Sequence, residues 1–259
     1  MKSSIDVLDS YASAFRDLVN AKVQSSRKDV RELLRLNRDR DWNFLCTAMD
    51  VVGDASGAIR NFLQFGLDGP TRYQDVGEKY LRLYGLLSAA YIQQQSAIKL
   101  FELMNVPHPK AIKTRFDALE IRDLRHKLAA HSTDYSNRTT QAMETYVPIQ
   151  IGVGGFICTF TNNESTTHKA VDLEKAIEDH CRLIISVLDA TYEKAIQTLY
   201  KGQSKKLSEF AERLQDLRTE KEGGLVIRMQ GGPKLVIHTV GDRNLTARSS
   251  RTRRKRRAG

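Results

Sequence analysis

The residues that could do chemistry in this chain lie in one short segment, Arg125-His126-Lys127-Leu128-Ala129-Ala130-His131. It places an arginine and a histidine six positions apart, and a second histidine follows the arginine directly. A guanidinium binds phosphate oxygens through several N–H groups, and an imidazole gives and takes protons near neutral pH. Metal-free cleavage of an RNA backbone needs both of these functions. Arg125, His126 and His131 are therefore the catalytic candidates.

The motif lies in a segment, about His108 to Thr133, whose composition predicts one continuous helix. Pro109 stands near its first turn, glycine is absent, and alanine and straight-chain residues dominate. At ~100° per residue, one narrow apolar stripe forms from Ile121, Leu124 and Leu128. Arg125 and His131 flank this stripe, each roughly 60° from its centre. An apolar stripe with reactive groups on both rims predicts a surface for self-association.

This segment resembles the HEPN superfamily, all-helical proteins whose ribonuclease members carry an arginine, a short spacer and a histidine late in the domain. The resemblance covers Arg125, His126 as the polar residue that follows the arginine, and His131. It implies a homodimer in which the Arg and His groups of two copies form one RNA-cutting site, with no metal and no cofactor. It also implies settings such as toxin–antitoxin or phage-defence systems, with an antitoxin or another regulatory partner.

The expected mechanism follows from these residue types. His131 assists proton transfer at the ribose 2′-hydroxyl or at the leaving 5′-oxygen, and His126 orients or assists. Arg125, from the same or the partner chain, stabilises the charge that develops on the phosphate. Cleavage should then yield a 2′,3′-cyclic phosphate and tolerate chelators.

The net charge of +10 is concentrated at the C-terminal end of the sequence. Residues 243–259 hold eight basic residues and no acidic one, which leaves a charge of +2 for the rest. A tail of this composition cannot bury apolar surface, so we expect it to be disordered. It would bind RNA or DNA by releasing counterions, without sequence preference. The nucleic-acid-binding candidates are Arg251, Arg253, Arg254, Lys255, Arg256 and Arg257.

Two other interpretations of the sequence stay open. The protein could be a non-catalytic helical dimer of the same fold that binds RNA or DNA through its basic tail, without cutting it. The tail could also be a solvated segment that aids solubility, or a nuclear-import signal in a eukaryotic host.

Metal chemistry and secretion are not favoured by the composition. Cys158, His168, His180 and Cys181 lack the spacing of a zinc site, so no metal ligands are predicted. The three cysteines form no CxxC pair, which indicates a reducing compartment. No apolar run approaches the ~20 residues of a membrane span, and the first residues do not read as a signal peptide. We expect a cytoplasmic protein without membrane partners.

Hydrophobic periodicity predicts a mainly α fold with an inserted β-hairpin and a small C-terminal extension. The resemblance implies that the helices form an HEPN-like antiparallel helical bundle. We expect four parts: outer helices at 1–40, a helical domain at 41–202, a helix plus short hairpin at 203–242, and the disordered tail at 243–259. Within the second part, helices are expected from Asp41 to about Gly66, at about 75–105 and at about 172–200. Alternating residues and Gly154-Gly155 predict the hairpin at about 145–161.

Overall fold

The structure is a computed structural model of the chain, and it describes residues 2–71, 75–137, 140–162, 168–228 and 234–237. In these ranges the chain is mainly helical, with small antiparallel sheets of two or three strands. The predicted mainly α fold is therefore confirmed. The basic tail, with its six nucleic-acid-binding candidates, lies outside the described residues.

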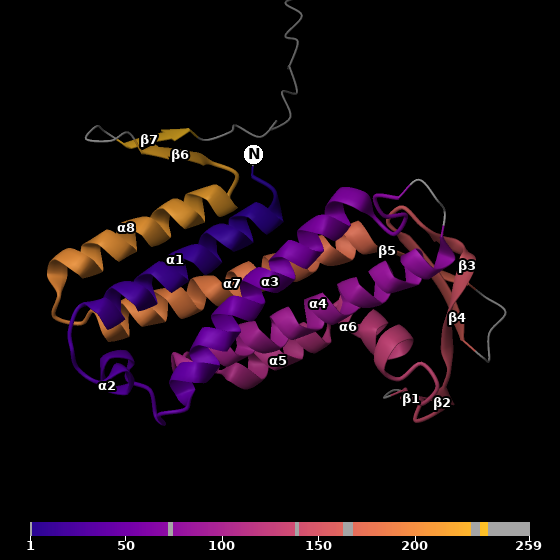
Figure 1. Cartoon of the computed structure of the whole chain (residues 1–259), viewed down its shortest axis with the longest axis horizontal. Coiled ribbons are helices and arrows are strands. Elements are labelled where there is room, and N and C mark those ends of the chain that lie inside the picture. Colours follow the sequence, from indigo (N-terminus) through magenta and orange to yellow (C-terminus); the bar gives the residue numbers. More distant parts are fainter. Residues whose placement is uncertain (1, 72–74, 138–139, 163–167, 229–233, 238–259) are drawn as a thin grey trace, which may run out of the picture.

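The α-helices account for most of the fold (Figure 1). They are α1 (Ser4–Gln24), α2 (Val30–Leu34), α3 (Asp41–Phe65), α4 (Val76–Leu103), α5 (Pro109–Asp117), α6 (Glu120–Leu124), α7 (Leu173–Leu199) and α8 (Ser204–Lys221). A π-helical segment, η1 (Arg125–Ala130), continues directly from α6.

The strands form three antiparallel units in the described residues. They are β1 (Tyr135–Ser136) with β2 (Met143–Glu144), β3 (Tyr146–Gly154) with β4 (Ile157–Asn162) and β5 (Lys169–Asp172), and β6 (Leu225–Arg228) with β7 (Lys234–Ile237). The inserted hairpin is thus confirmed as β3 and β4, and β5 adds a third strand that was not predicted. The short hairpin after α8 is also confirmed.

Helices α4 and α7 begin next to an aspartate whose side chain caps the first turn, near the residues where the sequence predicted the helices to begin. The Asp75 carboxylate accepts the N–H of Gly77 at 2.8 Å, and the Asp172 carboxylate accepts that of Lys175 at 3.1 Å. Asp41 begins α3, but it is the first helical residue and its carboxylate accepts the N–H of Arg38 at 3.0 Å. The predicted start of this helix at Asp41 is therefore right, although the N-cap residue is Arg40.

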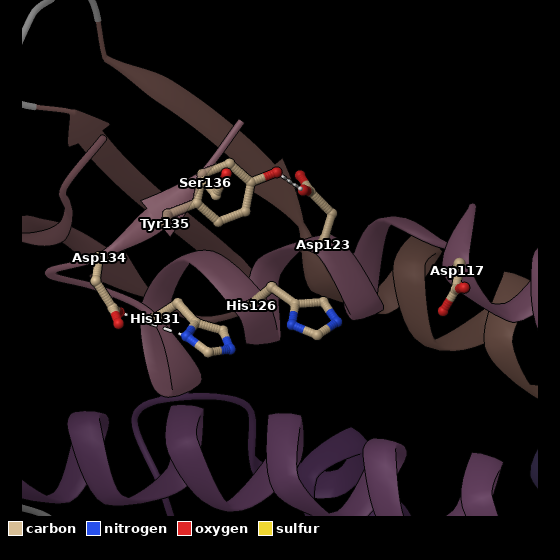
Figure 2. A pocket seen from close by; sticks show the side chains of 7 residues that line it. All are labelled: Asp117, Asp123, His126, His131, Asp134, Tyr135 and Ser136. Carbon is tan, nitrogen blue, oxygen red and sulfur yellow. Dashed lines mark hydrogen bonds and ion pairs between the residues drawn. The ribbon is translucent and has the colours of Figure 1, made fainter. Parts of the chain in front are cut away.

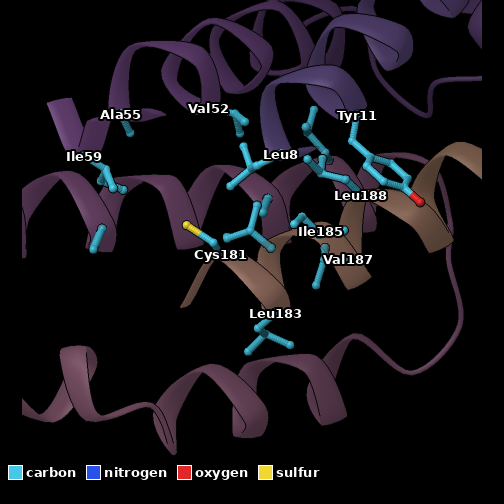
Figure 3. Packing of buried hydrophobic residues seen from close by; sticks show 14 of the residues in the cluster. Leu8, Tyr11, Val52, Ala55, Ile59, Cys181, Leu183, Ile185, Val187 and Leu188 are labelled. Carbon is cyan, nitrogen blue, oxygen red and sulfur yellow. The ribbon is translucent and has the colours of Figure 1, made fainter. Parts of the chain in front are cut away.

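The core lies where α1, α3, α4 and α7 pack together. Leu8 and Tyr11 of α1 are fully buried, as are Val52 and Ile59 of α3, and α1 packs on both α3 and α7 (Figure 3). Helix α8 covers α1 and α7, and its Arg218 forms an ion pair with Asp189 at 2.7 Å. Because α1 contributes directly to this core, the expectation that residues 1–40 form outer helices is wrong for α1.

The predicted single helix at 108–133 is interrupted. It consists of α5, a break at Ala118 and Leu119, and then α6 continuing into η1. Leu119 has an extended backbone, with ψ of 137°. The break turns the chain so that Phe116 and Ile121, on either side of it, are both buried. Burial of these two side chains outweighs the local helical propensity, which is a weak preference by comparison.

Two hydrogen bonds connect the loop after α3 to the turn of the β3–β4 hairpin. Gly66 has φ of +60°, and the N–H of the next residue, Leu67, donates to the carbonyl oxygen of Gly155 at 2.7 Å. The Gly155 N–H donates to the Asp68 carboxylate at 2.8 Å. A Cβ at Gly66 would lie 2.6 Å from the Gly155 oxygen. Only glycine meets both the backbone and the packing requirement here.

We predict that Gly66→Ala lowers the free energy of unfolding by about 2 kcal/mol or more, because a side chain at positive φ is strained and the added methyl meets backbone. Gly57→Ala is the matched control: Gly57 lies inside α3 with nothing within 4 Å of a Cβ, so alanine should stabilise by about 0.5–1 kcal/mol. Urea unfolding of the two variants checks the sign, and equal effects would contradict the junction's role.

Candidate active site

A π turn brings the two candidate histidines side by side. The N–H of His131 donates to the carbonyl oxygen of His126 at 2.9 Å, a bond that spans five residues instead of four. In an α-helix these residues would lie roughly 140° apart around the axis. Here their rings are nearly parallel, at 17°, with centroids 6.0 Å apart, and both project from the same side of η1 (Figure 2).

The two rings face an open cavity of about 510 Å³. Figure 2 shows its walls, which come from the end of α5, from α6 and η1, and from the chain that leads into β1. The residues lining it are Asp117, Asp123, His126, His131, Asp134, Tyr135 and Ser136. All of them carry groups that can hydrogen-bond or titrate. This cavity is where the structure places the predicted His126 and His131.

The two imidazoles have different surroundings. His131 has 52% of its side chain exposed, and its Nδ1 lies 3.4 Å from a carboxylate oxygen of Asp134. His126 is more enclosed, and its pKa lies below the ordinary value because burial disfavours the charged ring. The nearby cations Arg122 and Arg125 lower the pKa of His126 further. His126 is therefore neutral at pH 7 and can accept a proton.

Two of the three carboxylates that line the cavity form ion pairs with basic side chains. Asp117 lies 3.3 Å from the Arg122 guanidinium, and Asp123 lies 2.6 Å from Lys127 Nζ. Asp123 also accepts a hydrogen bond from the Tyr135 hydroxyl at 3.3 Å. These pairings reduce the negative charge that an approaching phosphate would meet.

The Arg125 side chain packs on an aromatic ring of α4. Its guanidinium carbon lies 3.6 Å from the ring centroid of Tyr91 on α4, and Arg122 lies over the same ring at 4.6 Å. Arg125 is not among the residues lining the cavity. The structure thus places the side chains of His126 and His131 together at the cavity, whereas the guanidinium of Arg125 packs on the ring of Tyr91. The contact with Tyr91 could not be predicted from the sequence, because the stacking of an arginine on an aromatic ring has no signal in helical spacing.

The apolar stripe at Ile121, Leu124 and Leu128 is buried inside the chain. Segments α6 and η1 pack on α4, and α6 also packs on α7. The stripe predicted to be a self-association surface is therefore part of the monomer's core, and that prediction is wrong. The amphipathic pattern of one helix indicates that its apolar face is buried. It does not show whether that face packs against the same chain or against a second copy.

A chain of hydrogen bonds connects the cavity with the interior. On the cavity side, Arg122 donates to the Gln94 side-chain oxygen at 3.0 Å. The Gln94 amide nitrogen lies 3.2 Å from Nδ1 of His180, and Nε2 of His180 lies 2.7 Å from the Gln93 oxygen. The Gln93 amide then donates to Ser56 and to the carbonyl of Val52 on α3. These bonds link α3, α4, α6 and α7.

His180 at the centre of this chain is a neutral imidazole. It is completely buried, and burial lowers its pKa to about 3. With Nε2 facing an amide oxygen and Nδ1 facing an amide nitrogen, the neutral ring with hydrogen on Nε2 satisfies both contacts. His180 therefore has a structural role. Among the described residues, no three His, Cys, Asp or Glu side chains are grouped as metal ligands.

Comparison of the chain with models of known protein families, with curated proteins and with solved structures found no match. In the described part of the chain, no helix combines the length and the apolar character that crossing a membrane requires.

We predict that acid unfolds the protein partly through His180. In the unfolded chain His180 takes up a proton below its ordinary pKa of 6.5, whereas the folded protein resists until about pH 3. Stability contributed by the neutral ring is thus present above pH 6.5 and is lost as the pH falls. Between pH 8 and pH 5 the loss should be about 2 kcal/mol.

The measurement is urea unfolding of the wild type and His180→Gln at both pH values. The variant should be less stable at pH 8 but should lose about 2 kcal/mol less on acidification. Equal losses in the two proteins would show that His180 does not carry this pH dependence.

Proposed function

We propose that this protein is a metal-independent endoribonuclease of HEPN type, acting in the cytoplasm. The observation that carries the proposal is the pair of histidines, His126 and His131, held side by side on one wall of an open polar cavity. Two imidazoles in different environments can act as base and acid in one reaction.

In the proposed reaction, neutral His126 removes the proton from a ribose 2′-hydroxyl. The 2′-oxygen then attacks the adjacent phosphorus, and the bond from phosphorus to the 5′-oxygen breaks. Protonated His131, oriented by Asp134, gives its proton to the leaving 5′-oxygen. The products are a 2′,3′-cyclic phosphate and a 5′-hydroxyl, and no metal or redox partner takes part.

Arg125 would stabilise the charge that develops on the phosphate. Its contact with Tyr91 is a cation–π interaction, worth about 0.5–2 kcal/mol. A charge-assisted bond to a phosphate is of similar or greater strength, so substrate could draw the guanidinium away from the ring. The alternative source is Arg125 of a second copy across a dimer interface.

A homodimer could use an uncharged stripe on the outer side of α4. Leu81 and Ile92 are 73% and 46% exposed, and Tyr84 lies between them along the same face. Gly85 and Ser88, also exposed, offer little side-chain bulk and allow a second helix to approach. Tyr91, which holds Arg125, borders this stripe, so a partner seated on it would lie beside the cavity. An antitoxin or another regulatory partner could silence the enzyme by covering the same region.

We predict that purified protein cuts RNA in EDTA and leaves cyclic-phosphate ends. His131→Ala and His126→Ala should each lower the rate by about 10²-fold or more, because each removes a proton-transfer group. His168→Ala, an exposed histidine outside the cavity, should cut at the wild-type rate. Uncut RNA with all four proteins, with retained RNA binding, would favour the non-catalytic scaffold that binds through its tail.

We also predict that Ile92→Arg makes the protein monomeric in sedimentation velocity runs and lowers cleavage, since a buried unpaired charge opposes docking. Leu207→Arg, which places the same charge on an exposed position of α8, should leave both unchanged. A wild-type protein that sediments as a monomer while cleaving RNA would contradict the dimeric site.

A further inference from the structure

A second polar cavity lies at the opposite end of the bundle from the histidines. It has a volume of about 300 Å³ and is formed where α1, α2 and α7 end. Figure 1 shows α2 at one end of the molecule and β1 and β2 toward the other. The cavity is lined by Lys22, Lys28, Glu32, Leu33, Arg35, Leu199 and Lys201.

The charges around this cavity are not balanced. Lys22, Lys28, Arg35 and Lys201 are cationic, and Glu32 is the one acidic residue among the lining side chains. None of these four cations forms an ion pair with a carboxylate in the described part of the chain. Three helix C-termini, each worth about half a negative charge, offset roughly half of the positive surplus. The remaining surplus favours an anion.

Lys22 shows the imbalance most clearly. It is only 9% exposed, and its ammonium lies 5.3 Å from the centroid of the Tyr200 ring. Burial lowers its pKa, and the positive charge of Arg35 lowers it further. A buried lysine usually faces a carboxylate, because an unpaired charge in the interior is costly. Here Lys22 faces a polar cavity and other cations.

Tyr200 fixes the position of Lys22. The tyrosine is buried, and its hydroxyl donates to the carbonyl oxygen of Leu18 at 2.8 Å. Its ring packs on Phe210 of α8, with centroids 4.8 Å apart. The lysine ammonium is thus held against a rigid surface, which lowers the entropy that binding an anion would cost.

We propose that this cavity, hereafter the cationic end site, binds a phosphate group. Lys22 supplies a pre-positioned ammonium, Arg35 supplies a guanidinium suited to two phosphate oxygens, and Lys28 and Lys201 complete the charge. Its volume corresponds to roughly ten water molecules, enough for a phosphate with part of its hydration shell. The phosphate comes either from a small soluble molecule or from an RNA backbone. The inference does not depend on cleavage at the histidines.

The test is binding to the full chain, measured in two arms. The first arm titrates inorganic phosphate and pyrophosphate by ³¹P NMR. The second measures fluorescence anisotropy of a labelled single-stranded RNA in a His131→Ala background, so that the RNA stays intact. The basic tail is present in every protein, so its contribution is common to all.

The variants are Lys22→Gln and, because a change at a buried lysine could disturb folding, the double variant Lys28→Gln/Lys201→Gln at exposed positions. Lys175→Gln is the matched control, an exposed lysine roughly 36 Å away along α7 from Leu199. We expect affinity for at least one probe to fall about tenfold or more in both test variants and to stay within twofold in the control.

The two arms distinguish the source of the phosphate. A loss for pyrophosphate alone identifies a small soluble ligand, and a loss for RNA identifies the nucleic-acid backbone. Wild-type affinity for every probe in the double variant, or an equal loss in Lys175→Gln, would overturn the proposal.

Discussion

A neutral imidazole in the core, that of His180, is the centre of the hydrogen bonds that link α3, α4, α6 and α7. His180 joins Gln93 and Gln94 of α4 from its place on α7, and through them reaches Ser56 on α3 and Arg122 on α6. An unsatisfied polar group at this depth would cost several kcal/mol, so each helix must keep its register for all of the bonds to form. The same chain of bonds ends at Arg122, which pairs with Asp117 at the cavity. The histidine pair is therefore built on a segment that the core already fixes.

The histidine site and the cationic end site are held in different ways. At the first, the backbone does the positioning, because a π turn aligns two side chains that share one helical segment. At the second, three helix ends meet, and a buried aromatic ring positions one lysine. If one RNA reached both, it would run along the length of α7, about 40 Å for 27 helical residues. The basic tail would add an attraction without sequence preference.

Much of the fold could be predicted, because hydrophobic periodicity indicates the buried face of each main helix and capping residues indicate where the helix begins or ends. Asp75, Asp172 and Gly66 mark boundaries by capping or by backbone freedom, and the alternation at 145–161 marks a hairpin. The break at Leu119, the burial of the stripe at Ile121, and the Arg125–Tyr91 contact could not be predicted in this way. Each depends on which neighbour covers a face, and that is decided by packing between distant segments. The burial of Lys22 could not be predicted either, because a single sequence gives no signal that three helix ends meet around it.

The π turn also changes how the spacing of the two histidines should be interpreted. Residues four apart in an α-helix lie roughly 40° from each other around the axis, on nearly the same face. His126 and His131 reach an equivalent arrangement at a separation of five, because the π turn absorbs the additional residue. Two sequences with different spacers can therefore encode the same side-chain geometry, one in regular helix and the other in a π turn. A sequence search for paired histidines that allows only one spacer length would therefore miss proteins in which the two side chains have the same arrangement.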